Sequence, residues 1–167
     1  ILVVARLTHE KHVDLVARTL SYISGYVPNV VCVVLGDGRE HDEIAAVAKS
    51  LGEAQRIFFE GHIENTSPYY ERADVVVIPS WTEGYGRTAI EAMAYGKPVV
   101  MTDVGLAGEI VRNQYNGLIV PIDDDGALAE SLVRIATDKN LTATLSQNAL
   151  LSFSNLPSND KLVEEVI

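Results

Sequence analysis

Apolar runs of strand length alternate with helical patterns along most of this chain. The runs are continuous and rich in β-branched residues, as in Val75-Val76-Val77-Ile78, and lack the polar–apolar alternation of a half-exposed strand. Such runs are typical of parallel strands that helices cover on both faces. A repeated strand-then-helix order also requires right-handed crossovers, which place the strands in an open sheet. The sequence therefore predicts a three-layer α/β/α domain with a six-stranded parallel sheet.

The expected elements follow the same periodicities. Six ranges are predicted as strands: 1–5, 30–35, 56–60, 75–79, 98–102 and 117–121. Helices are predicted where apolar residues recur at helical spacing, over 13–23, 44–51, 67–72, 88–95, 107–113, 127–137, 141–153 and 161–167. Gly52 is the expected C-cap of the second helix. Because no linker or repeat interrupts 1–138, we expect the 167 residues to form one domain.

Charge and cysteine content limit the class of protein. The net charge of −10 argues against a nucleic-acid partner, which would require a basic face. An anionic small molecule remains possible, since it needs only a few positive groups at one place. The lone Cys32 lies in an apolar run and is expected to be buried, which fits a reducing compartment. We expect a cytoplasmic protein, at the inner face of the membrane if the full-length chain associates with one, and we expect further sequence upstream.

Candidate functional residues lie where strands end. Open parallel sheets bind ligands outside the carboxyl ends of their strands, at the point where the strand order reverses. Arg6 and Lys11 follow the first strand, and two cations near a helix N-terminus can neutralise a diphosphate. Without context, solvated loop charges are the commoner interpretation. The Gly36–Gly38 turn lacks the third glycine of a dinucleotide fingerprint, because position 41 is His41, and is interpreted as a tight turn.

A second candidate region, 80–91, follows the fourth strand. Gly84 and Gly86 let the backbone approach a ligand closely. The helix that begins after them presents the amides of 87–89 to an anion. Glu83 and Glu91 can accept hydrogen bonds from sugar hydroxyls. The alternative is that Glu83 is a surface charge and Glu91 complements the helix dipole.

Residues 83–100, EGYGRTAIEAMAYGKPVV, resemble the E-x7-E region of family 4 (group 1) retaining glycosyltransferases. Six further segments resemble that family in order: 5–11, 33–38, 58–63, 73–86, 102–111 and 116–121. The resemblance implies a GT-B fold, in which two Rossmann-like domains enclose the active site. On this basis residues 1–167 are the nucleotide-sugar-binding C-terminal domain, and the N-terminal acceptor domain is absent from the chain.

The resemblance also implies a role for each matching residue. Arg6 and Lys11 would neutralise the donor diphosphate, Glu83 would contact the donor sugar near the reacting centre, and Glu91 would bind the ribose hydroxyls. The remaining positions fall into three groups: Gly84, Tyr85 and Gly86 for sugar hydroxyls, Arg87, Thr88 and Ala89 for phosphates, and Gly61, His62 and Ile63 for the base. The chain departs from the family at two positions, with Ala5 and His12 where glycine is usual or frequent.

The implied function is retaining transfer of a sugar, of the hexosyltransferase type, from a nucleotide-diphosphate donor to an acceptor glycan, lipid or small molecule. No cofactor or divalent metal is expected, because cations and helix amides stabilise the leaving diphosphate. The Asp123–Asp125 run is interpreted as a helix N-cap with solvated charge. The fragment alone is expected to be inactive. The alternatives are a sugar phosphorylase or sugar-nucleotide epimerase of the same fold, or a non-catalytic nucleotide-binding module, although four intact charged site residues argue against the last.

Overall fold

All six apolar runs form strands of one parallel sheet. The computed structural model describes residues 1–156. The strands are β1 (Leu2–Val4), β2 (Cys32–Leu35), β3 (Ile57–Gly61), β4 (Val76–Ile78), β5 (Val99–Thr102) and β6 (Gly117–Val120). Their order is β3-β2-β1-β4-β5-β6, and every neighbouring pair is parallel. The predicted six-stranded parallel sheet is confirmed.

The strand order reverses once, between β1 and β4. From β1 the chain moves outward to β2 and β3, returns across the sheet to β4, and then moves outward in the other direction. The loops that follow β1 and β4 therefore leave toward opposite faces of the sheet. A crevice opens between such loops at the carboxyl edge, so this reversal fixes where a ligand can bind.

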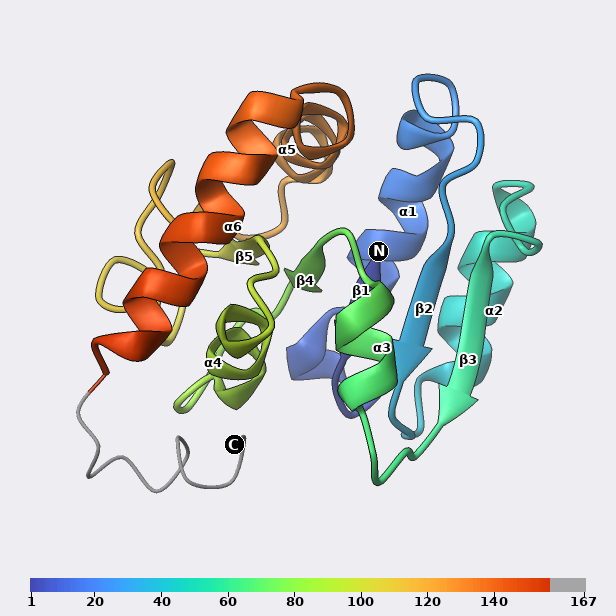
Figure 1. Cartoon of the computed structure of the whole chain (residues 1–167). Coiled ribbons are helices and arrows are strands. Elements are labelled where there is room, and N and C mark those ends of the chain that lie inside the picture. The colour runs from blue at the N-terminus through green and yellow to red at the C-terminus, as the bar shows by residue number, and fades with distance from the viewer. Residues whose placement is uncertain (157–167) are drawn as a thin grey trace.

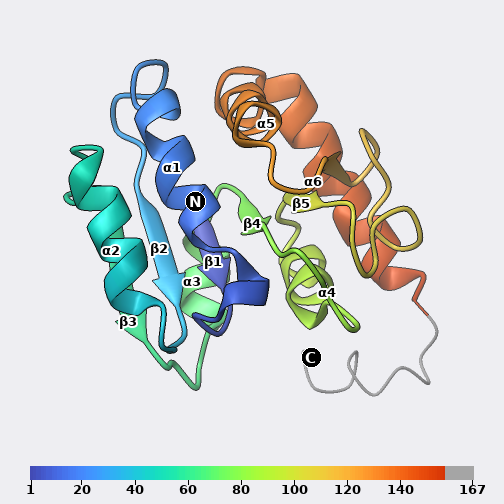
Figure 2. The same cartoon turned by 180° about the vertical axis from the view of Figure 1, so that it is seen from behind.

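Three helices cover each face of the sheet. One face carries α1 (Asp14–Ile23), α2 (His41–Ser50) and α5 (Asp125–Thr137), and the other carries α3 (Ser67–Arg72), α4 (Arg87–Ala94) and α6 (Lys139–Ser154). Figure 1 views the second face, and Figure 2 shows α1 and α2 from the opposite side. A short 3-10 turn, η1 (His9–Lys11), precedes α1. The three-layer arrangement explains why the central strands β1, β2 and β4 are apolar at every position.

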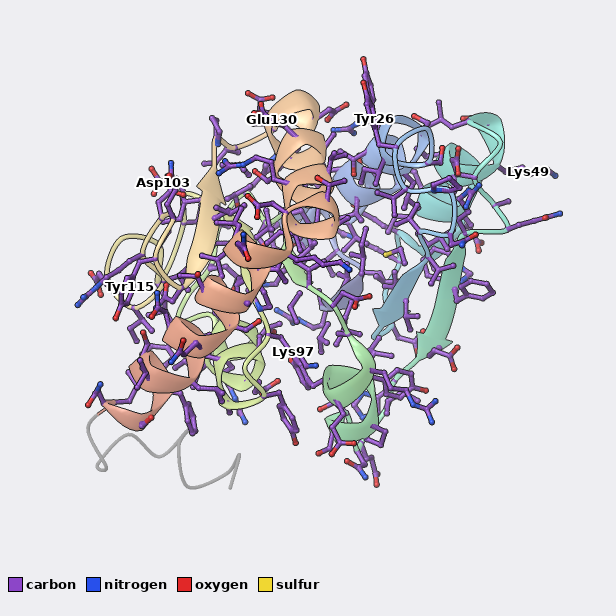
Figure 3. All side chains as sticks on the ribbon, turned by 45° about the horizontal axis from the view of Figure 1, so that its top comes forward. Tyr26, Lys49, Lys97, Asp103, Tyr115 and Glu130 are labelled. Carbon is purple, nitrogen blue, oxygen red and sulfur yellow. The ribbon has the colours of Figure 1, made fainter. Side chains whose placement is uncertain are left out.

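Alternate strand residues belong to two separate cores. Val3 and Val77 pack with α1, α2 and α5, whereas Leu2 and Val76 pack with α3, α4 and α6. Cys32 is fully buried as predicted, and this burial raises the pKa of its thiol to about 12, which keeps the sulfur unreactive. Polar and aromatic side chains project from the periphery, as Figure 3 shows for Tyr26 and Lys49.

The helix predicted over 107–113 is wrong. This segment forms turns and short bridges instead. Gly105 and Gly108 take φ angles of 56° and 80°, which a helix does not allow. The side chain of Asn116 then holds the turn, accepting from the Arg112 N–H at 2.7 Å and donating to the Ile110 carbonyl at 2.9 Å. The helix expected over 161–167 lies outside the described residues.

Gly36 and Gly38 have a more specific role than a tight turn. A Cβ atom on Gly36 would lie 2.0 Å from the Ala5 carbonyl oxygen, and one on Gly38 would lie 2.1 Å from the Leu7 carbonyl oxygen. The two loops also share a hydrogen bond from the Leu7 N–H to the Asp37 carbonyl at 2.9 Å. The glycines therefore let the loop after β2 pack directly against the loop after β1, which carries candidate site residues.

Substituting Gly38 tests this close approach. We expect Gly38→Ala to lower the free energy of unfolding by about 1–3 kcal/mol, because the added methyl group would overlap backbone atoms of Leu7. Gly25→Ala is the matched control, since its Cβ would meet only the Tyr22 carbonyl oxygen, at 3.7 Å, and neither glycine has a positive φ. Urea unfolding of the two variants and the wild type measures the difference. Equal midpoints for both variants would contradict the steric argument.

Candidate functional site

Two neighbouring cavities lie at the carboxyl edge of the sheet, where the strand order reverses. The α4-side cavity has a volume of about 330 Å³, and its lining includes Lys11, Ser80, Glu83, Gly86, Arg87 and Thr88. The β2-side cavity has a volume of about 440 Å³, and its lining includes Arg6, Gly36, Asp37, His62 and Ile63. Both cavities are lined by Val4 and Ala5 at the end of β1. Most of the predicted site residues therefore gather at one sheet edge.

The N-terminus of α4 opens onto the α4-side cavity. Gly86 precedes the helix with a φ of 79°, a conformation that glycine adopts without strain. Arg87 is exposed and Thr88 half-buried, whereas Ala89 is buried and its N–H donates to the Gly86 carbonyl at 3.0 Å. The helix dipole and the first-turn amides favour an anion at this place. Of the three amides predicted to meet phosphates, that of Ala89 already has an internal partner.

Lys11 and Glu83 form an ion pair in the same cavity. Lys11 Nζ donates to Glu83 Oε1 at 2.8 Å, and the Ser80 hydroxyl donates to the same oxygen at 2.6 Å. The two charged side chains are 17% and 11% exposed, so water screens them little. Sequence reasoning missed this pair, because 72 residues separate its members. Since an ammonium group has three protons, Lys11 can hold Glu83 and still donate to a ligand.

Arg6 lies beside this cavity but not in it. Its side chain is 77% exposed, and its Nη2 atom lies 3.9 Å from Glu10 Oε1. It lines the β2-side cavity, so the expected convergence of Arg6 and Lys11 on one cavity is only partly observed. The physical reason is that Arg6 leaves the end of β1 toward solvent, where Glu10 is a distant and exposed partner. Such a side chain can reorient when a diphosphate supplies a stronger partner.

Glu91 lies one helical turn after Arg87 in α4, and a buried tyrosine holds its side chain. The Tyr70 hydroxyl of α3 donates to Glu91 Oε2 at 2.7 Å, and Arg87 Nε lies 3.9 Å from Glu91 Oε1. Tyr70 is fully buried and stacks on Tyr95 with ring centroids 5.4 Å apart. Burial and the adjacent carboxylate raise the pKa of the Tyr70 phenol, so it remains a hydrogen-bond donor. The sequence did not identify Tyr70, because only tertiary packing places α3 against α4.

The segment predicted to hold the base borders the β2-side cavity. His62 and Ile63 line it, and His62 is exposed. Gly61 takes a φ of 70°, and its carbonyl accepts the Gly36 N–H at 2.7 Å. This bond fixes the end of β3 against the loop after β2. The backbone of Gly61 is therefore held beside the cavity that His62 and Ile63 line.

Asp124 of the Asp123–Asp125 run caps α5, as predicted, but the expected solvated charge is wrong, because Asp123 and Asp125 both pair with Arg18. Asp124 Oδ1 accepts the Ala127 N–H at 2.8 Å, which satisfies a first-turn amide of the helix. Among residues 1–156, no group of three or more His, Cys, Asp or Glu side chains is arranged to hold a metal ion. Within the same range, no helix combines the length and the apolar character that crossing a membrane requires.

Comparison with known proteins assigns the family. Residues 1–151 match the family described as glycosyl transferases group 1. The chain belongs to this family. It is 34% identical over 153 residues to LpsB of Rhizobium meliloti, a lipopolysaccharide core biosynthesis mannosyltransferase, and the match covers 87% of this chain. The chain spans only 43% of the length of LpsB.

Two solved structures share the fold of this group 1 domain. HepE of Anabaena, solved in complex with UDP, is 26% identical with a TM-score of 0.87, over 99% of this chain and 47% of HepE. The C-terminal domain of LpcC, a group 1 family protein of Francisella tularensis, is 25% identical with a TM-score of 0.83. That match covers 92% of this chain and 83% of the LpcC domain. The Rossmann-like fold and the relation to one half of a GT-B glycosyltransferase are confirmed.

The Tyr70–Glu91 hydrogen bond can be tested by removing one hydroxyl. We expect Tyr70→Phe to lower the free energy of unfolding by about 1–3 kcal/mol, because Glu91 would lose a partly buried hydrogen bond to its charge. Tyr69→Phe on the same helix is the control, since its longer bond to Glu60 (3.3 Å) is exposed, and we expect a change within about 0.5 kcal/mol. Thermal and urea unfolding measure both values. A Tyr70→Phe variant as stable as Tyr69→Phe would refute this role.

Proposed function

We propose that this chain binds a nucleotide-diphosphate sugar, and that the protein containing it transfers the sugar, with retention of anomeric configuration, to an acceptor glycan, lipid or small molecule. One observation carries the proposal. Three features lie together where the strand order reverses. They are the N-terminus of α4, the Lys11–Glu83 pair and the backbone of Gly61, which is hydrogen-bonded beside the β2-side cavity. The presence of UDP in the related HepE structure supports a nucleotide ligand for this chain as well.

The chemistry of sugar transfer accounts for the cations. Breaking the bond between the anomeric carbon and the diphosphate develops negative charge on the leaving phosphate. Lys11 and the first-turn amides of α4 are preorganised where that charge would develop, so they would stabilise the transition state more than the bound donor. The exposed Arg6 would reorient from the neighbouring cavity to grip the diphosphate with two N–H groups. These groups supply the charge that a divalent metal would otherwise supply, so no metal or other cofactor is required.

The remaining residues would recognise the rest of the donor. Glu83 would contact the donor sugar near its reacting carbon, with the backbone of Gly84–Gly86 holding other sugar hydroxyls. An added Cβ on Gly84 would meet no atom within 4 Å, so this backbone is open to a ligand. Glu91 would bind the ribose hydroxyls in the orientation that Tyr70 fixes. The base would occupy the β2-side cavity beside His62 and Ile63.

The acceptor would bind to a part of the protein outside this chain. The chain spans 43% of the length of LpsB, which is a lipopolysaccharide core biosynthesis mannosyltransferase. By analogy, an N-terminal domain of the same polypeptide would bind the acceptor glycan or lipid at the cytoplasmic face of a membrane. The chain alone would bind the donor weakly and transfer no sugar.

Nucleotide-sugar titrations test the binding site. We expect Arg6→Ala and Glu91→Ala each to weaken binding of the preferred donor by about 10- to 100-fold, because each change removes hydrogen bonds to or from a charged group worth about 1.5–3 kcal/mol. Isothermal titration calorimetry with UDP-, GDP- and ADP-glucose and GDP-mannose identifies the base. Arg72→Ala is the control, since Arg72 is exposed at the far end of α3. Equal affinities for all variants would refute the site.

Metal independence is tested by the same titrations. We expect the affinity of the wild type for its donor to change by less than about 2-fold when EDTA replaces magnesium, because Lys11 and the α4 amides provide the positive charge. Calorimetry in the two buffers at equal ionic strength makes the comparison. A loss of donor binding in EDTA that magnesium restores would contradict the metal-free site.

A further inference from the structure

The residue that follows Lys11 has an unusual backbone conformation. His12 takes φ 50° and ψ 41°, the left-handed region, at the end of η1. Glycine enters this region freely, whereas other residues do so at a cost. His12 is nevertheless only 4% exposed. A strained residue that is also buried must be held in place by its surroundings.

Two carboxylates hold the His12 ring from opposite sides. Nδ1 lies 3.0 Å from Asp14 Oδ1, and Nε2 lies 3.0 Å from Asp123 Oδ1. A neutral imidazole has one N–H donor, whereas a carboxylate only accepts. Both contacts are satisfied together only when both ring nitrogens carry a proton. The two carboxylate contacts therefore favour the imidazolium form.

The surrounding charges are consistent with this form. Arg18 Nη2 lies 3.4 Å from Nε2 and opposes protonation, but Arg18 is itself paired with Asp14, Asp123 and Asp125. Burial lowers the pKa of the His12 imidazole, but the hydrogen bonds to Asp14 and Asp123 and the charge of Asp14 outweigh it, so the net pKa is raised. His12 and its partners line a third cavity, of about 220 Å³. Other titratable groups that line it are His9, Glu40 and Glu43.

His12 also joins three loops of the carboxyl edge. Its ring packs on the Trp81 ring with centroids 4.5 Å apart. The backbone N–H of Trp81 donates to the Glu10 carbonyl at 2.9 Å. A cation on the face of an indole is favourable. Trp81 belongs to the loop that carries Glu83, and Asp123 belongs to the loop between β6 and α5. The loops after β1, β4 and β6 therefore meet at one side chain.

We propose that His12, held as an imidazolium between Asp14 and Asp123 and packed on Trp81, is a positioning residue that fixes Lys11 opposite Glu83 for the donor diphosphate. The protonation of His12 between the two aspartates is independent of the donor. The positioning of Lys11 for the donor diphosphate rests on the proposed function. We call the contacts of the His12 ring with Asp14 and Asp123 the clamp. Because the protonated ring makes both contacts, the clamp is complete at pH values below the pKa of His12 in the folded protein. It loses one contact as the pH rises through that value, and donor affinity falls with it.

The first experiment observes the ring directly. Long-range ¹H–¹⁵N NMR spectra of the wild-type chain, with His12 assigned by comparison with His12→Asn, report the protonation of each ring nitrogen across a pH titration. We expect the His12 midpoint to lie above the ordinary value of about 6.5, and both His12 nitrogens to carry protons at pH values below that midpoint. Asp123→Asn should lower that midpoint. An unprotonated Nε2 at about pH 6 would overturn the clamp.

The second experiment measures the consequence for ligand binding. UDP, GDP and ADP are titrated into wild type and His12→Asn, since asparagine tolerates the left-handed conformation but cannot bridge two carboxylates. We expect His12→Asn to bind the preferred nucleotide about 3- to 30-fold more weakly at pH about 6.5, and the difference to narrow above the His12 midpoint. His41→Asn, which removes an exposed histidine that contacts Asp42 and Phe59, is the control and should bind as the wild type does.

The two experiments separate the possible failures. Equal nucleotide affinity for wild type and His12→Asn at every pH would overturn the positioning role, even if the NMR spectra show the imidazolium. If no nucleotide binds to the wild type, the proposed function fails and the positioning role fails with it, while the spectra still decide the clamp. If His12→Asn does not fold, Asp123→Asn replaces it. Its nucleotide affinity should then fall at lower pH than that of the wild type.

Discussion

The reversal of strand order between β1 and β4 is the constraint on which the rest of this structure depends. The two strands are hydrogen-bonded neighbours, yet the chain leaves them toward opposite faces of the sheet. The loop after β1 therefore brings Lys11 to one side of the crevice, and the loop after β4 brings Glu83 and the N-terminus of α4 to the other. A cation and a helix dipole can face one ligand only because the topology separates their loops at this point.

Close backbone contact keeps the crevice in shape. Gly36 and Gly38 let the loop after β2 lie against the loop after β1, where any side chain would overlap carbonyl oxygens. On the other side, the Trp81 N–H ties the loop after β4 to Glu10. The positions of Arg6 and Lys11 along the edge thus follow from main-chain packing. This packing fixes the backbone of both residues, whereas the exposed side chain of Arg6 can still reorient.

The site is locally balanced in charge although the chain carries a net charge of −10. Lys11 is paired with Glu83, and Arg18 is surrounded by aspartates. Burying such pairs costs desolvation energy, and the Ser80 hydrogen bond to Glu83 offsets part of it. An anionic donor would thus meet groups that are already oriented. Membership of the group 1 family supports the proposed sugar transfer, and this arrangement explains how the residues of the chain would take part in it.

The sequence by itself determined the layers, the sheet and the segments that contain the site. Two-sided burial demands continuous apolar strands, and this demand is visible in neighbouring residues such as Val75–Ile78. The tertiary structure alone decided which side chains meet: Lys11 with Glu83, Tyr70 with Glu91, and His12 with two aspartates. It also replaced the helix predicted over 107–113 with turns. Periodicity along the chain shows only which local structure and burial a segment favours. The partner of a polar side chain depends on which loops the topology brings together.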